Sequence, residues 1–179
     1  RSLGLFANDS LLFFLDVDMH FTSDVLRRVR RNTVMHQQVY FPIVFSQYSN
    51  QVSKNFSGYG ELSIDDRDGY WRQFGFGIVS LYRVDLMAVG GYDENINGWG
   101  MEDVSLYDRF VASNLTIFRA AEPGLVHIYH DIHCDTHLAP VQFEMCLGTK
   151  LSSLDSITEL AAYANSNNLL RAHSDEPLD

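Results

Sequence analysis

Near its beginning the chain carries LLFFLDVD at residues 11–18, an apolar run that stops abruptly at two aspartates. An apolar run without alternation is typical of a strand covered on both faces, as in a parallel or mixed sheet flanked by helices. In such sheets ligands bind beyond the carboxyl ends of the strands, which is where Asp16 and Asp18 fall. The run therefore predicts an α/β fold with a candidate ligand site at these aspartates.

The remaining segments fit one α/β domain over residues 1–165, followed by a polar tail at 166–179. Helices are predicted from Thr22 onward and over 84–89, 103–112 and 153–165, and strands over 39–45, 115–119 and 125–129. Pro42 interrupts the strand at 39–45, and because proline cannot donate to a ladder, that strand is predicted at a sheet edge. Residues 47–69 are polar and are expected to form a long surface loop.

Composition narrows the class of protein. The 179 residues suffice for one domain, and 13 Lys plus Arg against 23 Asp plus Glu leave a net charge of −10. That balance argues against general nucleic-acid binding, which needs a cationic surface. No apolar run reaches the roughly 18 residues of a transmembrane helix, so none is expected within the chain. Because the chain opens without Met, we expect it to be a piece of a longer protein.

The compartment is suggested by three Asn-x-Ser/Thr sequons, which begin at Asn8, Asn55 and Asn114 and favour a secretory lumen. In such an oxidising lumen Cys134 and Cys146 would form a disulfide bond. The residues alone leave a second interpretation open, in which the two are separate buried thiols.

Asp16 and Asp18 are the first candidates for chemistry. Residues two apart in an extended segment point the same way, so both carboxylates can face one pocket. At the end of a buried strand they would repel each other unless a cation lay between them. A hard divalent ion such as Mn²⁺ or Mg²⁺ suits such oxygen ligands. The alternative is a solvated turn after the strand.

A second candidate is GWGMED at residues 98–103. Glycines on both sides of Trp99 let the loop bend and let the indole ring lie against a flat ligand such as a sugar. Glu102 and Asp103 offer two carboxylates, one of which can act as a general base. The same pair also fits a helix N-terminus with acidic residues near its dipole, and the two interpretations are compatible.

Histidines form the third candidate, with His127, His130, His133 and His137 close together in the sequence. On an extended segment His127 and His130 would lie on opposite faces, so a turn is needed for both to bind one metal. The alternative is that they are hydrogen-bonded core residues. The basic residues at 27–31 are predicted to form a solvated helix face, with contact to an anionic ligand as the other possibility.

Six motifs in unbroken order resemble the C-terminal domain of chondroitin synthases and chondroitin N-acetylgalactosaminyltransferases, and more weakly the beta-1,4-galactosyltransferases. They are LFFLDVD (12–18), FSQY (45–48), WRQFGFG (71–77), GGYD (90–93), GWGMED (98–103) and MCLG (145–148). The resemblance covers about residues 1–150. It implies the GT-A nucleotide-sugar transferase fold, a mixed sheet between helices, here N-terminally truncated because the family's uridine-binding strands precede residue 1.

The activity implied by the resemblance is inverting transfer of N-acetylgalactosamine from UDP-N-acetylgalactosamine to the 4-hydroxyl of a glucuronic acid ending a chondroitin chain. The implied metal is Mn²⁺, held by Asp18 and His130, with His127 as a second candidate ligand. Asp16 is implied beside the metal, near the donor. Asp103 matches the catalytic base.

Other residues are implied to bind the sugars: Glu102 through their hydroxyls and Trp99 by covering the donor. The acceptor is a chondroitin oligosaccharide or other glycosaminoglycan, and it is anionic, so Arg72 or the basic cluster at 27–31 is expected to supply a local positive field. Met101 replaces a Gly of the galactosyltransferases, which is expected to alter the sugar pocket. The family also implies a Golgi lumen location, with a type II membrane anchor in preceding sequence.

Two other functions compete with this one. A chondroitin polymerising factor would keep the fold and act as a weakly or non-catalytic subunit of a synthase complex, and the complete set of Asp16, Asp18, Asp103 and His130 argues against it. A non-haem iron oxygenase would use Asp18, His127 and His130, but nothing else in the chain suggests one.

Overall fold

Two four-stranded mixed sheets form the centre of the computed structural model, which describes residues 6–49 and 64–166. The first sheet runs in the order β1 (Leu11–Phe14), β6 (Val79–Tyr82), β3 (Gln38–Tyr40) and β7 (Thr116–Phe118). The second runs β2 (Met19–Phe21), β8 (Ala121–His127), β4 (Ile43–Gln47) and β5 (Gly69–Trp71). Each sheet has one parallel pair, β3 with β7 and β4 with β8, among antiparallel neighbours.

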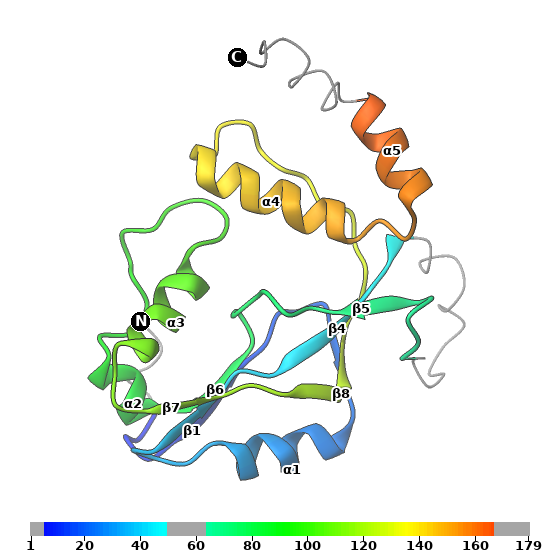
Figure 1. Ribbon diagram of the computed structural model, residues 1–179. Helices are drawn as coiled ribbons and strands as arrows, with labels where there is room; N and C mark the ends of the chain where they lie inside the picture. The colour runs from blue at the N-terminus through cyan, green and yellow to red at the C-terminus, as the bar shows by residue number, and fades with distance from the viewer. Residues whose placement is uncertain (1–5, 50–63, 167–179) are drawn as a thin grey trace, which may run out of the picture.

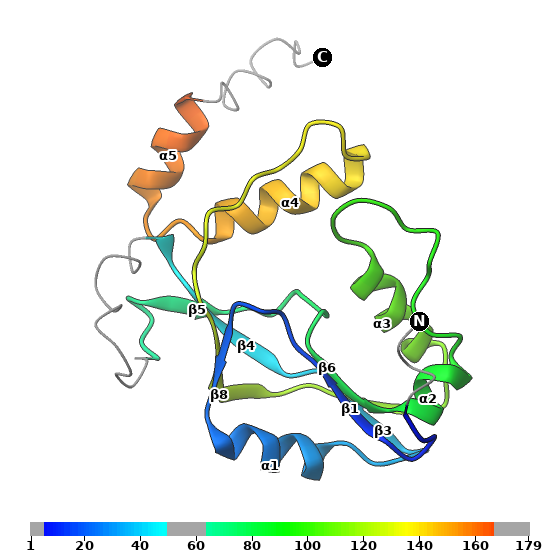
Figure 2. The same cartoon turned by 180° about the vertical axis from the view of Figure 1, so that it is seen from behind.

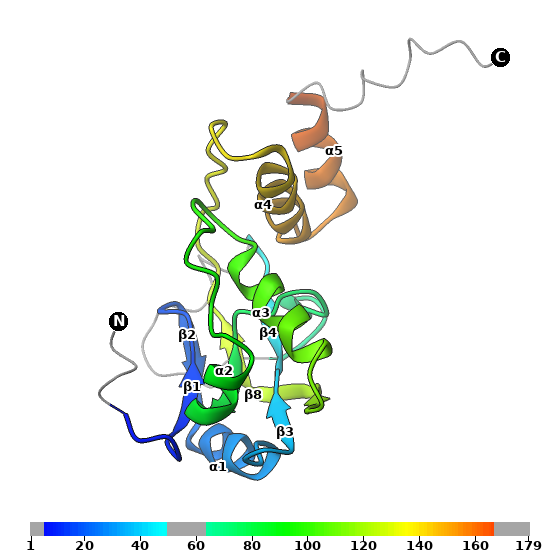
Figure 3. The same cartoon turned by 90° about the vertical axis from the view of Figure 1, so that its left-hand side faces the viewer.

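The helices are α1 (Ser23–Asn32), α2 (Arg83–Ala88), α3 (Glu102–Val111), α4 (Pro140–Ser152) and α5 (Ile157–Ser166). Helix α1 lies on one side of the strands and α4 on the other, with α2 and α3 at one end (Figures 1 and 2). Helix α5 extends beyond α4, away from the sheets (Figure 3). Among the described helices, none has both the length and the apolar character needed to cross a membrane.

Strand β1 confirms the α/β prediction, because its two faces pack on two different cores. Leu12 and Phe14 contact the first core and Phe13 and Leu15 the second. The first core consists of Val39, Phe41, Val79, Leu81, Leu86, Leu106 and Phe110, and the second of Val25, Val29, Tyr40, Val44, Ile78 and Leu125. Because both faces of β1 are covered, its residues must be apolar without alternation, although β1 is the end strand of its sheet in the described residues.

The prediction of one edge strand over 39–45 was wrong. Phe41 and Pro42 separate two strands, β3 and β4, which belong to different sheets and each have neighbours on both sides. The amides of Phe41 and Ile43 donate to the carbonyls of Phe118 and Ala120, at 2.9 and 2.8 Å. Pro42 lies between them, at the crossing from one sheet to the other, where its missing N–H breaks no ladder.

Helix boundaries were predicted well in the middle of the chain and poorly at its end. The expected helices at 84–89 and 103–112 are α2 and α3 to within one residue. The helix expected over 153–165 begins only at Ile157, and the longer α4 before it was missed. Much of the predicted loop at 47–69 and nearly all of the predicted tail at 166–179 lie outside the described residues.

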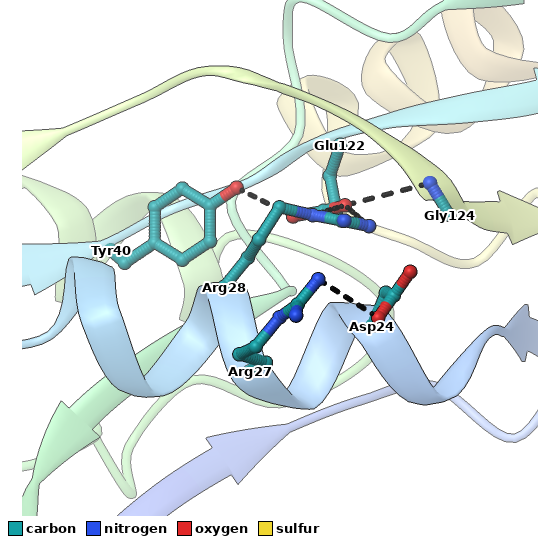
Figure 4. A network of polar contacts seen from close by, with 6 residues as sticks. All are labelled: Asp24, Arg27, Arg28, Tyr40, Glu122 and Gly124. Carbon is teal, nitrogen blue, oxygen red and sulfur yellow. Dashed lines mark hydrogen bonds and ion pairs between the residues drawn. The ribbon is translucent and has the colours of Figure 1, made fainter.

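A buried carboxylate joins α1 to both sheets. The side chain of Glu122 on β8 is 1% exposed, and it accepts hydrogen bonds from Arg28 Nε at 2.7 Å and Tyr40 Oη at 3.2 Å (Figure 4). Burial, followed by the charge of Glu122, raises the pKa of Tyr40. Gly124 allows the start of α1 to lie close to β8, since a Cβ at residue 124 would lie 2.5 Å from Thr22 Oγ1. The ion pair is thus completed inside the protein.

We expect Glu122→Gln to lower the free energy of unfolding by roughly 1.5–3 kcal/mol, the range for a hydrogen bond to a charged group. The matched control is Asp24→Asn, which removes the exposed ion pair between Asp24 and Arg27 on helix α1. Exposed pairs contribute about 0–1 kcal/mol. Chemical unfolding of both variants measures the difference, and equal small losses would contradict a structural role for Glu122.

Candidate metal and sugar-transfer site

Strand pairing brings Asp18 beside two histidines. Met19 at the start of β2 pairs with His127 at the end of β8, so Asp18 lies next to the residues that follow β8. The Ile128 amide donates to the Asp18 carbonyl at 3.0 Å, which fixes this junction. Beyond His127 the chain leaves the strand, and the turn that the sequence required brings His130 back to the same carboxylate.

The three side chains form a group that fits a divalent cation. Asp18 Oδ2 lies 3.4 Å from His127 Nε2 and 3.0 Å from His130 Nε2, and one ligand atom from each residue lies within 4.8 Å of the others. Asp18 Oδ1 is buried without a hydrogen-bond partner in the described structure. His130 Nδ1 lies 3.1 Å from the Asp131 carbonyl oxygen, so the tautomer with its proton on Nδ1 would have Nε2 available to coordinate a metal.

The electrostatic surroundings favour the neutral form of His127, which is the form that binds metal. Burial lowers the pKa of the His127 imidazole, and Asp18 only partly opposes this, so His127 is held neutral. Partial burial raises the pKa of the Asp16 carboxyl, and the charge of Asp18 raises it further while Arg72 lowers it. One carboxylate and two imidazoles form a mixed oxygen and nitrogen ligand set, which divalent transition-metal ions accept.

A second carboxylate group lies close by, at the start of α3. The charge of Asp103 also raises the pKa of Asp16. Burial, followed by the charges of Asp103, Glu102 and Asp16, raises the pKa of Tyr92 to about 12. Asp16 and Asp103 are linked by one loop, since Asp103 accepts the Phe76 amide and a Cβ on Gly77 would lie 3.8 Å from Asp16 Oδ2. In the sequence Tyr92 was noted only as part of the GGYD motif, and an aromatic residue next to two glycines is the feature that could have marked it as a site residue.

Asp103 is held by two backbone amides. Its Oδ2 accepts the Phe76 amide at 3.0 Å, and its Oδ1 accepts the Val104 amide at 2.8 Å. The second donor belongs to the first turn of α3, where acidic residues are favoured by the helix dipole. The N-terminus of α3 therefore also forms part of the site, and the two interpretations of Glu102 and Asp103 are compatible, as the sequence suggested.

Trp99 lies in the loop before α3 and is 42% exposed. The loop is attached to α4 by Gln142 Nε2, which donates to the Asn97 and Gly100 carbonyls at 2.9 and 3.4 Å. Met101 adopts a φ of 78°, the left-handed region that favours glycine. The substitution of Gly by Met noted in the sequence therefore falls at a backbone position that disfavours side chains.

Of the two cationic features predicted to face an anionic ligand, the structure brings Arg72 to the site. Arg72 lines a hollow beside the metal group together with His127, His130 and Gln47. Gln47 Oε1 accepts the Tyr129 amide at 3.3 Å, which holds the chain between the two histidines. In the basic cluster at 27–31, by contrast, Arg28 on α1 binds Glu122 on β8 (Figure 4).

Cys134 and Cys146 form a disulfide bond. Cys146 lies in the buried side of α4, and Cys134 lies four residues after His130. The bond resolves the two interpretations left open by the sequence. It also attaches the segment that carries His130 to α4.

The mixed sheets flanked by helices and the aspartate–histidine group match a GT-A-like glycosyltransferase. The chain belongs to the chondroitin N-acetylgalactosaminyltransferase family, whose model matches residues 2–160. It is 47% identical over 169 residues to chondroitin sulfate synthase 3 of Mus musculus, and the match covers 90% of the chain. Identity to chondroitin sulfate N-acetylgalactosaminyltransferase 1 of Mus musculus is 42% over 150 residues, covering 78% of the chain.

The chain corresponds to a minor part of these relatives. The two alignments span 19% and 27% of the relatives' own lengths. Chondroitin sulfate synthase 2 of Mus musculus matches at 26% identity over 161 residues, 86% of the chain and 20% of its own length. These matches make the chain part of a chondroitin-synthesising glycosyltransferase family.

We expect Asp18→Asn and His130→Gln each to weaken Mn²⁺ binding by at least ~100-fold, because even changes outside the ligand shell cost about 10–100-fold. Titration of the intact protein, with free Mn²⁺ followed by electron paramagnetic resonance, measures the affinity. His137→Gln is the control, since His137 lies in the same segment but pairs with Asp135. Unchanged affinity in Asp18→Asn would remove this residue from the site.

We expect the double variant Cys134→Ser/Cys146→Ser to lose roughly 2–4 kcal/mol of unfolding free energy, because the disulfide restricts the unfolded chain. Chemical unfolding with and without reductant provides the measurement. Reductant should destabilise the wild-type protein and leave the double variant unchanged. Peptide mapping that finds both cysteines as free thiols in secreted protein would refute the pairing.

Proposed function

We propose that the chain carries the acceptor-side and metal-binding half of an inverting transferase. It moves N-acetylgalactosamine from UDP-N-acetylgalactosamine to the 4-hydroxyl of a terminal glucuronic acid in chondroitin. The observation that carries the proposal is the juxtaposition of two groups. One is the Asp18, His127 and His130 set, which could hold a metal. The other is Asp103, which accepts the Phe76 amide, while a Cβ on the next residue, Gly77, would lie 3.8 Å from Asp16 Oδ2. Family membership supports the reaction class.

The metal group serves the leaving diphosphate. Mn²⁺ bound by Asp18, His130 and His127 would offset the negative charge that develops on UDP as the sugar departs. Neutral histidines leave the ion with more positive charge for the phosphate oxygens than carboxylates would. Arg72 adds a fixed cation on the same side of the site, next to both histidines.

Asp103 is proposed as the base that takes the proton from the acceptor hydroxyl. Inversion needs a single in-line displacement, so one carboxylate on the acceptor side is sufficient. The two amides that bind Asp103 fix the direction of its carboxylate. A base that is oriented before the acceptor arrives reduces the entropy lost in reaching the reactive geometry.

The remaining predicted residues are assigned to binding the sugars. Glu102, one residue before the base, is proposed to bind sugar hydroxyls. Trp99 is proposed to cover the donor by moving onto it. Its ring is partly exposed and has a glycine on each side in the chain, and both features suit such a movement. Asp16 is proposed to contact the donor beside the metal. Arg72 is also the proposed partner of the acceptor's carboxylate, in a protein whose net charge of −10 otherwise repels it.

A direct test is transfer by the intact protein from UDP-N-acetylgalactosamine to chondroitin oligosaccharides that end in glucuronic acid. Product with a β1-4 linkage, formed only with a divalent metal, supports the proposal. Absence of transfer by a folded protein that binds Mn²⁺ and UDP would support the alternative, a weakly or non-catalytic polymerising factor that works with a synthase partner.

A Golgi lumen location is part of the proposal, with the membrane anchor in a segment that precedes this chain. The disulfide bond supports it, since such bonds persist in oxidising compartments. The sequon residues Asn8 and Asn114 are both exposed, as luminal glycosylation requires, while Asn55 lies outside the described residues.

We expect Asp103→Asn to lower the turnover number about 100-fold or more, the usual loss when a general base is removed. Binding of UDP-N-acetylgalactosamine should be retained, because the amide side chain keeps an oxygen that accepts the Phe76 N–H. Asp108→Asn, an exposed position on the same helix, is the control and should have normal turnover. Near-normal turnover in Asp103→Asn would exclude Asp103 as the base.

A further inference from the structure

Arg119 follows β7 and makes a set of contacts that the proposed mechanism does not use. Its Nη2 donates to the Gln73 carbonyl at 2.8 Å. Its guanidinium carbon lies 4.6 Å from the centre of the Phe76 ring and 5.7 Å from that of Tyr107. Its Nη1 is buried and has no hydrogen-bond partner in the described structure. A partly exposed cation thus has one nitrogen buried without a partner and lies against an aromatic pair.

The aromatic pair joins a loop to helix α3. The Phe76 and Tyr107 rings are stacked, with centroids 4.0 Å apart and planes at 21°. Phe76 belongs to the connection between β5 and β6, which runs beside α3 (Figures 1 and 2). Tyr107 lies one helical turn after Asp103, on the same side of α3. The guanidinium lies near both rings of the stacked pair, and the three side chains are called here the Arg119 stack.

The loop needs such support because its own backbone is permissive. Phe76 lies between Gly75 and Gly77, and Gly75 adopts a φ of 141°. Glycines broaden the range of conformations that a loop samples, so the direction of the Phe76 amide is not fixed by local sequence. Arg119 holds the loop at two points, the Gln73 carbonyl and the Phe76 ring.

From these contacts we propose that Arg119 is a positioning residue for Asp103. Through the Arg119 stack it fixes the Phe76 amide, which is the donor to Asp103 that comes from outside α3. The Val104 amide alone would leave the carboxylate free to turn about its last torsion. The proposal rests on the assignment of Asp103 as the base, and the experiment separates the two.

The first measurement does not depend on catalysis. In the intact protein, Arg119→Met should speed hydrogen–deuterium exchange of the Phe76 amide by tenfold or more, and Arg119→Lys by less. Arg109→Met is the matched control. Arg109 is another arginine that donates to loop carbonyls, those of Gly90 and Gly91, and it does not contact Phe76. Its Phe76 exchange should equal that of the wild type. Unchanged Phe76 exchange in Arg119→Met would overturn the proposal, whatever the transfer assay shows.

The second measurement uses transfer kinetics. Arg119→Met should lower kcat about tenfold or more and leave the KM for UDP-N-acetylgalactosamine within about twofold, with rates normalised to the fraction of molecules that bind UDP and Mn²⁺. Phe76→Leu, which keeps the amide and removes the ring, should lower kcat in the same way as Arg119→Met. Phe76→Tyr, which keeps an aromatic ring, should have the kcat of the wild type. In the Asp103→Asn background, Arg119→Met should cost nothing further, because residues that act through one group are not additive.

The outcomes distinguish the two assignments. Faster Phe76 exchange with an additive loss of kcat in the Asp103→Asn background overturns the link to Asp103. A loss of kcat that disappears after normalisation shows a purely structural role and also overturns it. Faster exchange in a protein whose Asp103→Asn variant keeps full turnover supports the positioning contact and refutes Asp103 as the base.

Discussion

The pairing of β2 with β8 is the constraint on which the site depends. Asp18 immediately precedes β2, and antiparallel pairing of Met19 with His127 places it at the end of β8. The Ile128 amide bonded to the Asp18 carbonyl then fixes the point at which the chain leaves the sheet. Backbone hydrogen bonds therefore set the position of Asp18 relative to the end of β8. Three strand residues suffice because β8 is itself held by β4 and by the Glu122 network.

Charge is the second constraint. Several carboxylates lie close together at the site: burial raises the pKa of Asp16, and the charges of Asp18 and Asp103 raise it further. Arg72 offsets part of this effect, and the buried, unpaired Asp18 Oδ1 shows that the compensation within the described residues is incomplete. A divalent cation between Asp18 and the histidines would supply the remainder. The uncompensated charge therefore supports the proposed metal site.

The α/β class and the closeness of Asp18 to His127 and His130 were predicted from the sequence, whereas the division of the strands into two sheets was not. The unalternating apolar run identified β1 and the aspartates after it, because covering both faces of a strand leaves a strong pattern. It could not show that Pro42 separates two strands of different sheets, since a crossing between sheets leaves no periodic signal. Helix α4 was missed because its apolar residues are interrupted by polar residues and by Gly148. Contacts such as Phe76 to Asp103 depend on a backbone amide, and a backbone amide has no sequence signature.

The missed helix also explains how the two halves of the site are joined. Through the disulfide, Cys146 of α4 restrains the segment that carries His130. Through Gln142, the same helix binds the loop that carries Trp99. Cys146 and Gln142 lie four residues apart, one turn along α4 and on the same face. A movement of the Trp99 loop that required α4 to shift would therefore be transmitted to the metal ligand, whereas a movement that broke only the Gln142 bonds would not. Because two amide hydrogen bonds are weaker than a covalent bridge, the loop is the part that can move while His130 stays in place.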